Sequence, residues 1–344
     1  QEYVELIQAR SKEVAQRLRE SAVRQRKKVY GTSVFIRGLI EISNICKNDC
    51  LYCGIRKSNK NVSRYRLTDD EILSCCEAGF EAGFKTFVLQ GGEDAFFTDE
   101  KICNLLKSIK STYPDCAITL SLGEKSKESY ALLKKSGADR YLLREETANP
   151  LHYKKLHPEN MNHQNRLDCL KNLKELGFQT GAGFMVGSPY QTLEDIAKDL
   201  FFIQELKPQM VGIGPFIPHS QTEFANFPQG DLDLTLFILS LLRIMNPKVL
   251  LPATTALSTI NPEGRILGIL SGANVVMPNL SPASVRKKYM LYDNKLSDGA
   301  ESAHRPSGYV HRGGDGVFPS VRSDGAAAHS GLSSVQEFHD VRAG

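Results

Sequence analysis

Short apolar runs alternate with amphipathic stretches along most of the chain. The apolar runs are rich in Val, Ile, Leu and Phe, as expected of buried strands, and lie at residues 36–43, 86–90, 116–122, 140–144, 179–186, 210–217, 248–251 and 274–277. Between them apolar residues recur at helical spacing, at about 69–83, 98–112, 126–136, 163–176, 192–206, 233–245, 262–271 and 282–289. Eight strands alternating with eight helices predict an α/β fold, a (β/α)8 barrel of the TIM type. A doubly wound sheet also alternates, but usually with fewer units.

The two ends of the chain differ from this alternating middle. Residues 2–29 have one long helical pattern and predict an N-terminal helix outside the barrel. From about residue 301 onward the chain holds four of its eight His but very few large apolar residues, and shows no sustained period. Such a segment cannot supply much core, so we expect it to be disordered. The predicted organisation is a helical extension at 1–30, a barrel at 31–300 and an atypical tail at 301–344.

Composition excludes several classes of protein. Of 344 residues, 41% are hydrophobic and 24% charged, and the net charge is only +4. This is typical of a globular enzyme, and a nucleic-acid partner would call for a more concentrated basic surface. We find no apolar run of about 18 residues and no secretory leader, so the sequence predicts neither membrane insertion nor export, and we expect a cytoplasmic protein.

Three cysteines carry the most specific chemical signal. Cys46, Cys50 and Cys53 form a C-x3-C-x2-C motif directly after the first barrel strand. This is the end at which such barrels place their chemistry, and thiolates are ligands for zinc or iron–sulfur clusters. A structural zinc usually takes four ligands, and no second pair follows. We therefore favour a [4Fe–4S] cluster with one iron left open, over zinc or plain core thiols. The other cysteines are expected to be buried structural residues.

Further segments strengthen this interpretation. The cysteine loop, with an aromatic residue before its third Cys, resembles that of the radical S-adenosylmethionine (SAM) superfamily. Within the biotin synthase-like branch, the chain closely resembles the HydE family of [FeFe]-hydrogenase maturases. The resemblance covers about residues 30–300, and is carried by residues 37–44 (RGLIEISN), 89–94 (LQGGED), 121–124 (SLGE), 141–150 (YLLREETANP), 181–183 (GAG), 212–219 (GIGPFIPH), 252–256 (PATTA) and 272–279 (GANVVMPN).

The resemblance implies the cofactors and the residues that hold them. Cys46, Cys50 and Cys53 would hold the cluster, and SAM would bind its open iron and be cleaved reductively to a 5′-deoxyadenosyl radical. Tyr52 would lie along the adenine, and Gly91-Gly92-Glu93 would contact the methionyl amino group. Glu146 would accept hydrogen bonds from the ribose hydroxyls, and Arg166 would bind the methionyl carboxylate through two parallel hydrogen bonds. Without the resemblance these residues would be interpreted as packing, a turn and surface charges.

A second set of residues is expected to face the substrate. Ser121, Arg144, Thr254 and Thr255 follow predicted strands and would point into the barrel mouth. An arginine there indicates an anionic group on the substrate, a carboxylate or a cyanide-bearing complex. The alternative for Arg144 is an ion pair with the adjacent Glu145 or Glu146.

The resemblance also implies a function and partners. We expect a maturase that acts on a small molecule or small iron complex during assembly of the dithiolate-bridged diiron centre. Its partners would be a reductant protein such as a ferredoxin or flavodoxin, a maturation scaffold and a companion maturase. The alternatives are a methylornithine synthase, a biotin synthase-like enzyme, or a metal-binding carrier without catalytic activity.

Overall fold

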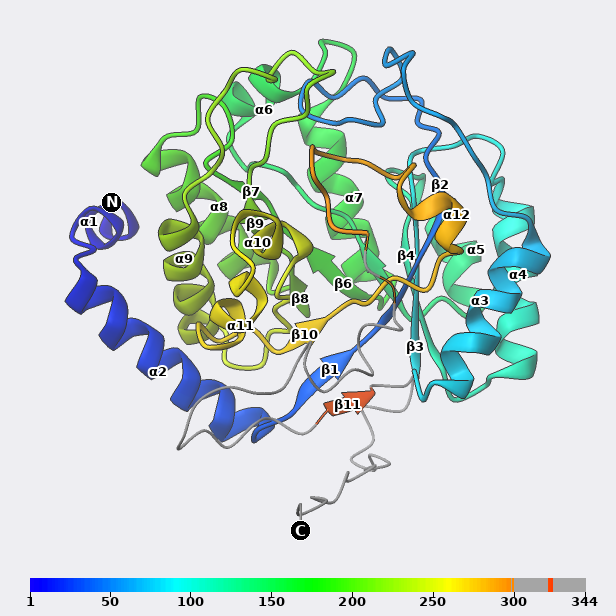
Figure 1. The fold of residues 1–344 in the computed structure, drawn as a ribbon, viewed down its shortest axis with the longest axis horizontal. Coiled ribbons are helices and arrows are strands. Elements are labelled where there is room, and N and C mark those ends of the chain that lie inside the picture. Colours follow the sequence, from blue (N-terminus) through cyan, green and yellow to red (C-terminus); the bar gives the residue numbers. More distant parts are fainter. Residues whose placement is uncertain (298, 300–320, 324–344) are drawn as a thin grey trace.

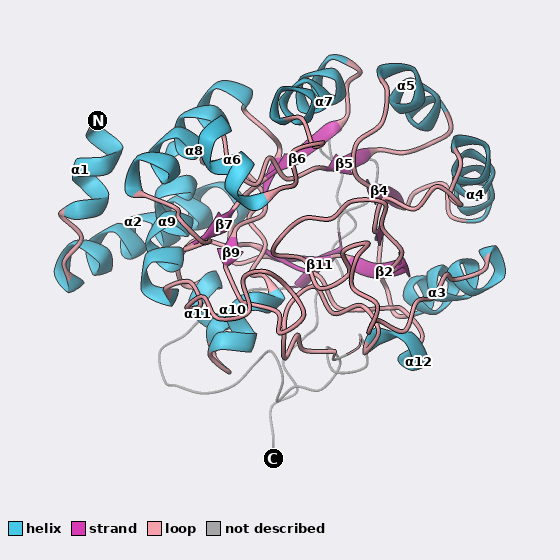
Figure 2. Cartoon of the chain, turned by 90° about the horizontal axis from the view of Figure 1, so that it is seen from above, coloured by secondary structure: helices cyan, strands magenta, loops and turns pink. Residues whose placement is uncertain are grey.

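The computed structural model describes residues 1–297, 299 and 321–323, and its centre is a barrel of parallel strands surrounded by helices (Figures 1 and 2). Every pairing between named strands is parallel, and six of them form one sheet in the order β2-β3-β4-β5-β6-β8. The strands are β1 (Val34–Ile36), β2 (Gly38–Ser43), β3 (Thr86–Gly91), β4 (Ala117–Ser121), β5 (Arg140–Leu142), β6 (Gln179–Ala182), β7 (Met185–Val186), β8 (Met210–Val211), β9 (Gly214–Pro215), β10 (Val275–Val276) and β11 (Val321–Ser323).

The barrel closes through short contacts rather than a long strand. Met210 in β8 bridges to Leu250, Pro252 bridges to Val275 in β10, and β10 pairs with β1. The predicted strand at 248–251 is therefore present only as isolated bridges. Pro252 has no N–H to donate to a ladder, which limits regular pairing at this position. With these bridges the predicted (β/α)8 barrel is confirmed.

Two predicted strands are interrupted near the barrel mouth. The run at 179–186 divides into β6 and β7, and the run at 210–217 divides into β8 and β9. Gly183, between β6 and β7, has φ 154°, and a Cβ there would stand 2.0 Å from the carbonyl oxygen of Gly212. Only glycine permits this backbone approach, so both strands bend at the same level and open the mouth of the barrel.

Helices cover the outside of the barrel, with the bounds α3 (Asp69–Glu81), α4 (Asp99–Thr112), α5 (Lys127–Lys135), α6 (Pro150–Leu156), α7 (His163–Glu175), α8 (Leu193–Leu206), α9 (Leu232–Met245), α10 (Thr255–Ile260), α11 (Gly264–Ile269) and α12 (Ala283–Arg286). Thr68 and Thr192 begin α3 and α8 with reciprocal capping boxes, because each hydroxyl accepts from the backbone three residues on. Helix α6 is not predicted from the sequence, where its seven residues are too short to show a period. None of the helices in the described part of the chain has the length and apolar character needed to cross a bilayer.

The N-terminal extension is two helices instead of the single helix predicted. They are α1 (Glu2–Gln8) and α2 (Lys12–Tyr30), and Ser11 begins the second by accepting a hydrogen bond from the backbone N–H of Val14. A capping serine between two helical patterns stops the first helix, and the apolar period alone does not reveal this. Helix α1 packs on α8 and α2 on α9, so the extension covers the outer helices on one side of the barrel (Figure 1).

Most of the tail lies outside the described residues, and the expectation that it is disordered lies there with it. The exception is β11, which pairs in parallel with β1. These three residues therefore differ from the expected disordered tail. Strand β1, which ends at Ile36, pairs with β10 on one side. It is β2, beginning at Gly38, that pairs with β3, so β3 does not cover the other side of β1. The free edge that β1 therefore presents explains why a short segment can pair there.

Candidate active site

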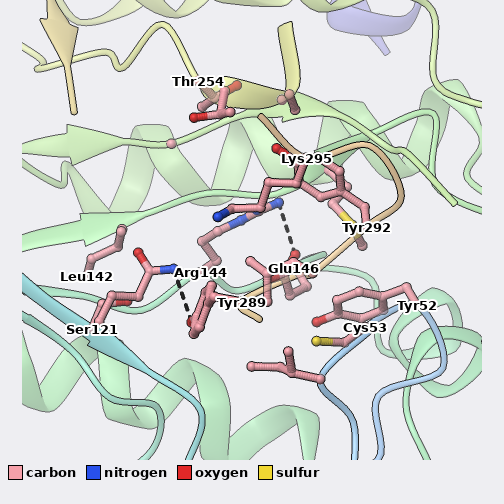
Figure 3. Close-up of a pocket in the computed structure, with 18 of the residues that line it drawn as sticks. Tyr52, Cys53, Ser121, Leu142, Arg144, Glu146, Thr254, Tyr289, Tyr292 and Lys295 are labelled. Atoms are coloured by element: carbon pink, nitrogen blue, oxygen red, sulfur yellow. Dashed lines mark hydrogen bonds and ion pairs between the residues drawn. The ribbon is translucent and has the colours of Figure 1, made fainter. Parts of the chain in front are cut away.

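A cavity of about 380 Å³ occupies the barrel interior and opens at the carboxyl ends of the strands (Figure 3). Its walls come from β2 to β5 and the loops that follow them, from α7, from β7 and β9, from residues 252–256 and from the segment after α12. All the site residues predicted from the sequence line it: Cys46, Tyr52, Cys50, Cys53, Gly91, Gly92, Glu93, Ser121, Arg144, Glu146, Arg166, Thr254 and Thr255. The structure thus brings together residues separated by more than two hundred positions.

The loop that carries the three cysteines is held in place by its backbone. The loop runs between Ser43 and Thr68. Its backbone forms hydrogen bonds with three other parts of the barrel: the β3–α4 loop, the end of α6 and the segment after α12. The N–H of Leu51 donates to Leu156 and that of Gly54 to Leu291, at 3.0 and 2.9 Å. These anchors keep the thiols on one side of the cavity.

Arg64 is a residue that the sequence did not single out, and it fixes the shape of this loop. Its guanidinium donates to the carbonyl oxygens of Asn44, Ile55, Arg56 and Asn59, at 2.6 to 3.1 Å. Because one planar cation joins four points of the loop, the loop has little freedom to spread. The positive charge also lies near Cys46 and Cys53 and favours their thiolate forms.

The three thiols are partly buried in the cavity wall, where burial disfavours their charged forms unless a cation is present. Burial raises the pKa of all three, that of Cys53 to about 12, and neighbouring negative charges raise them further: Glu93 for Cys46, and the other thiols for Cys50 and Cys53. Three thiolates at this place therefore require positive metal ions between them. The motif supplies three thiols and no fourth ligand, one fewer than a structural zinc usually takes. The donor set fits a cluster, which bonds each thiol to a different iron, better than one zinc.

The glycines after β3 let the next loop lie directly against the cysteines. A Cβ at Gly92 would stand 2.3 Å from the carbonyl oxygen of Ile45 and 2.8 Å from Cys46 Cβ, so no side chain fits. Glu93 follows and is already held, with Oε2 3.0 Å from Lys47 Nζ and Oε1 accepting from the backbone N–H of Glu124 at 3.0 Å. The half-buried Gly91–Gly92 backbone and this fixed carboxylate line the cavity, where their oxygens are candidate acceptors for an ammonium group beside the cluster loop.

Glu146 is positioned by a strained backbone. It has φ 65°, which is uncommon for a residue with a Cβ, and its N–H donates to Gly183 at 3.1 Å. Its Oε2 lies 3.1 Å from Arg144 Nη2, so the ion pair anticipated as an alternative for Arg144 is present. Arg144 Nη2 and Glu146 Oε2 are both buried, and neither makes a hydrogen bond with good geometry among the described residues. The two groups are therefore paired by charge but are poorly aligned for a hydrogen bond. The geometry leaves both groups with unused hydrogen-bonding capacity toward a ligand.

Arg166 is held by a carboxylate that the sequence motifs did not assign. Its Nε lies 2.7 Å from Glu124 Oε1, and the two side chains are 9% and 17% exposed. Burial lowers the pKa of Arg166, but the negative charges around it, that of Glu124 foremost, together outweigh burial and raise the pKa, so the guanidinium stays charged. Asn165 also donates to Glu124. Glu124 thereby fixes one edge of the guanidinium in the cavity wall, where the group can bind a carboxylate.

Tyr52 lies in the cavity wall between Cys50 and Cys53. Its hydroxyl is 3.3 Å from His157 Nε2, and the two rings meet edge to face. Burial lowers the pKa of His157 to about 3, so that imidazole is neutral. Since the hydroxyl is tied to a neutral partner, the ring has a fixed orientation suited to stacking against a planar ligand.

The deep end of the cavity contains residues that sequence reasoning missed. Tyr289, Tyr292 and Lys295 come from the segment after α12 and line the same cavity as Ser121 and Arg144 (Figure 3). Tyr289 accepts from Gln90 Nε2 at 3.3 Å, and Lys295 pairs with Glu41 at 2.7 Å. Thr254 Oγ1 is buried and has no partner among the described residues, whereas Thr255 accepts from Arg265 at 3.3 Å.

Behind Glu146, the buried carboxyl of Glu145 makes stability depend on pH. Burial raises the pKa of Glu145 to about 8, and burial together with Glu145 raises that of Asp199. Because the folded pKa of Glu145 exceeds its unfolded value near 4.5, its contribution is complete below about pH 4.5 and is lost as the pH rises through about 8.

As the pH rises from 5 to 8, the unfolding free energy of the wild-type protein should fall because Glu145 must ionise. We expect Glu145→Gln to reduce this fall by up to about 1.4 kcal/mol per pH unit. Urea unfolding of the reconstituted protein, followed by circular dichroism across this range, measures it. An unchanged slope in the variant would show that Glu145 does not titrate as described.

The barrel and the three-cysteine loop at its mouth define a radical SAM enzyme. The sequence model of the radical SAM superfamily matches residues 40–203, and this superfamily uses a [4Fe–4S] cluster and SAM. The [FeFe] hydrogenase maturase subunit HydE of Thermotoga maritima is 50% identical over 271 residues, which are 79% of this chain and 77% of that protein. The chain belongs to the HydE family.

More distant relatives share the fold. The 3-methylornithine synthase of Methanosarcina barkeri is 29% identical over 295 residues, 85% of this chain and 83% of that protein. A crystal structure of methylornithine synthase (PylB) matches with a TM-score of 0.74 at 28% identity, over 80% of each chain. The predicted superfamily and family are thus confirmed, while the roles of single residues stay predictions.

Proposed function

We propose that this radical SAM enzyme works in [FeFe]-hydrogenase maturation, on a small iron–cysteine precursor of the dithiolate-bridged diiron centre. The observation that carries the proposal is the shared cavity, in which the cysteine loop, the candidate SAM residues and a cation-rich deep end face one another. The 50% identity to a HydE maturase supports the choice among radical SAM reactions.

The cysteine loop would hold the cluster by three thiolates, from Cys46, Cys50 and Cys53. When bound, the cluster supplies the electron that cleaves the SAM sulfonium and yields the 5′-deoxyadenosyl radical. Arg64 and the backbone anchors of the loop fix the positions of the three thiols in the cavity wall.

SAM would lie between the cluster loop and the β5–α6 loop. Arg166, fixed on one edge by Glu124, binds the methionyl carboxylate, and Glu146 accepts from the ribose hydroxyls. Tyr52 supports the adenine, and Gly91-Gly92-Glu93 accepts from the methionyl ammonium. These contacts orient the sulfonium toward the open position of the cluster, which is the main contribution of the protein.

The substrate would occupy the deep end of the cavity, against Ser121, Arg144, Thr254 and Thr255. The closed barrel separates it from solvent, so that a carbon radical reacts with the substrate and not with the surroundings. The expected partners follow from this chemistry: a ferredoxin or flavodoxin as electron donor, a companion maturase and a maturation scaffold.

Methylornithine synthase is the second candidate, because the relatives with that activity cover 85% of this chain. Product analysis separates the candidates. The anaerobically reconstituted protein is given SAM, reductant and either L-lysine or a cyanide-bearing iron–cysteine complex, and products are identified by mass spectrometry. We expect 5′-deoxyadenosine formation to rise several-fold with the iron complex and no methylornithine from lysine.

Two results would contradict the proposal. Methylornithine formed from lysine would identify the second candidate as the activity. The absence of reductive SAM cleavage under every condition would instead favour a metal-binding carrier.

A further inference from the structure

The ion pair between Lys295 and Glu41 is buried in the wall of the cavity and has no role in the proposed cluster and SAM contacts. Lys295 Nζ is 2.7 Å from Glu41 Oε1, and the two side chains are 9% and 0% exposed. Removing both charges from water costs free energy that the pairing offsets only in part, so such a pair is a poor device for stability alone. Both residues line the cavity, where a ligand can use them.

Glu41 is immobile. Its Oε2 accepts from Asn279 Nδ2 at 2.9 Å, its backbone N–H donates to Ser281 at 2.7 Å, and its carbonyl accepts from Tyr65 at 2.8 Å. With every group of Glu41 engaged, the carboxylate sets the position of the lysine ammonium and not the reverse.

The Lys295 ammonium has donors to spare. It carries three N–H groups, and among the described residues Glu41 is its one hydrogen-bond acceptor, while the Tyr289 ring lies 5.3 Å from Nζ. Arg144 lines the same cavity and has Nε and Nη2 buried without a hydrogen-bond partner in the described part of the chain. Two cations with unused donors therefore face one enclosed space (Figure 3).

We propose that Lys295 is a specificity-determining residue of the substrate pocket, whose ammonium binds a carboxylate of the substrate, with Glu41 as its positioning residue. A carboxylate supplies the acceptors that the spare N–H groups lack, and charge-assisted bonds of this kind discriminate strongly in a dry site. The inference deepens the proposed function and rests on it, because an iron–cysteine substrate brings the carboxylate of an amino acid.

The test compares two probes that differ only in the carboxylate, L-cysteine and cysteamine. Binding of each is measured by anaerobic isothermal titration calorimetry to the cluster-containing protein with SAM bound, so that the open iron is already occupied. We expect wild-type protein to favour L-cysteine over cysteamine by about tenfold or more, and Lys295→Met to remove most of this preference while cysteamine affinity stays within about twofold. Lys295→Arg should restore part of it.

Two further variants guard against a purely structural effect. Lys295→Met leaves Glu41 buried without a cation, which can unfold the protein, so Lys295→Met/Glu41→Gln removes both charges together. This double variant should fold and show the same loss of preference. Lys287→Met changes an exposed lysine of the same segment and should leave the preference unchanged.

The possible failures are distinguishable. If SAM binds but wild-type protein does not prefer L-cysteine, or if the double variant keeps the preference, the role of Lys295 is overturned and the proposed function is untouched. If wild-type protein shows neither cluster nor SAM binding, both fall together.

Discussion

Replacing Cys50 with Ala is expected to abolish both the iron–sulfur cluster and 5′-deoxyadenosine formation, to the level of a protein-free control. Two thiols cannot hold a [4Fe–4S] cluster whose fourth iron has no protein ligand, so loss of one leaves no stable site. The loop itself should keep its shape, because Arg64 and the backbone anchors do not involve the Cys50 side chain. Iron and sulfide analysis after anaerobic reconstitution, with product quantification, measures the effect.

The matched control for this variant is Cys103→Ala. Cys103 lies on α4, is half-buried and does not line the cavity, so its loss should leave iron content and activity unchanged. Retained 5′-deoxyadenosine production in Cys50→Ala would show that the ligand assignment is wrong.

Replacing Arg166 with Ala is expected to leave the cluster in place but to weaken SAM binding by about 30-fold or more, the cost of losing one partner of a buried charge pair. The variant removes the N–H donors that bind the methionyl carboxylate. It also leaves the buried carboxylate of Glu124 without its cation. Equilibrium binding of SAM to the reconstituted variant, with iron analysis of the same sample, separates the two effects.

Lys171→Ala is the control, since Lys171 is an exposed cation on the same helix. Loss of iron in Arg166→Ala would place this arginine in support of the cluster loop and not of SAM. Unchanged SAM affinity would remove it from the binding site altogether.

Local sequence patterns were sufficient to predict the barrel, and the three cysteines that they single out line its cavity. Buried strands and amphipathic helices have periods that a single sequence displays, and the cysteine spacing is chemically specific. The residues expected to bind SAM were assigned through the family resemblance, because their motifs alone would be interpreted as a turn and surface charges, and their roles stay predictions. Strand interruptions were not predicted, because the approach of Gly183 to Gly212 depends on two segments meeting in space.

The residues missed were those whose importance comes only from distant contacts. Arg64 has no motif and matters through four carbonyls of its own loop, and Glu124 matters through Arg166 on another element. Lys295 lies in a short polar segment after α12 that is unremarkable in sequence, and its partner Glu41 is 254 positions away. No periodicity or spacing rule connects such pairs.

The central claim is that three cysteines hold a [4Fe–4S] cluster with one iron open to SAM. Electron paramagnetic resonance of the anaerobically reconstituted, reduced protein, recorded before and after addition of SAM, tests it most directly. We predict a [4Fe–4S]⁺ signal that changes when SAM is added. Zinc in place of iron, or a cluster signal that SAM leaves unaltered, would contradict the account.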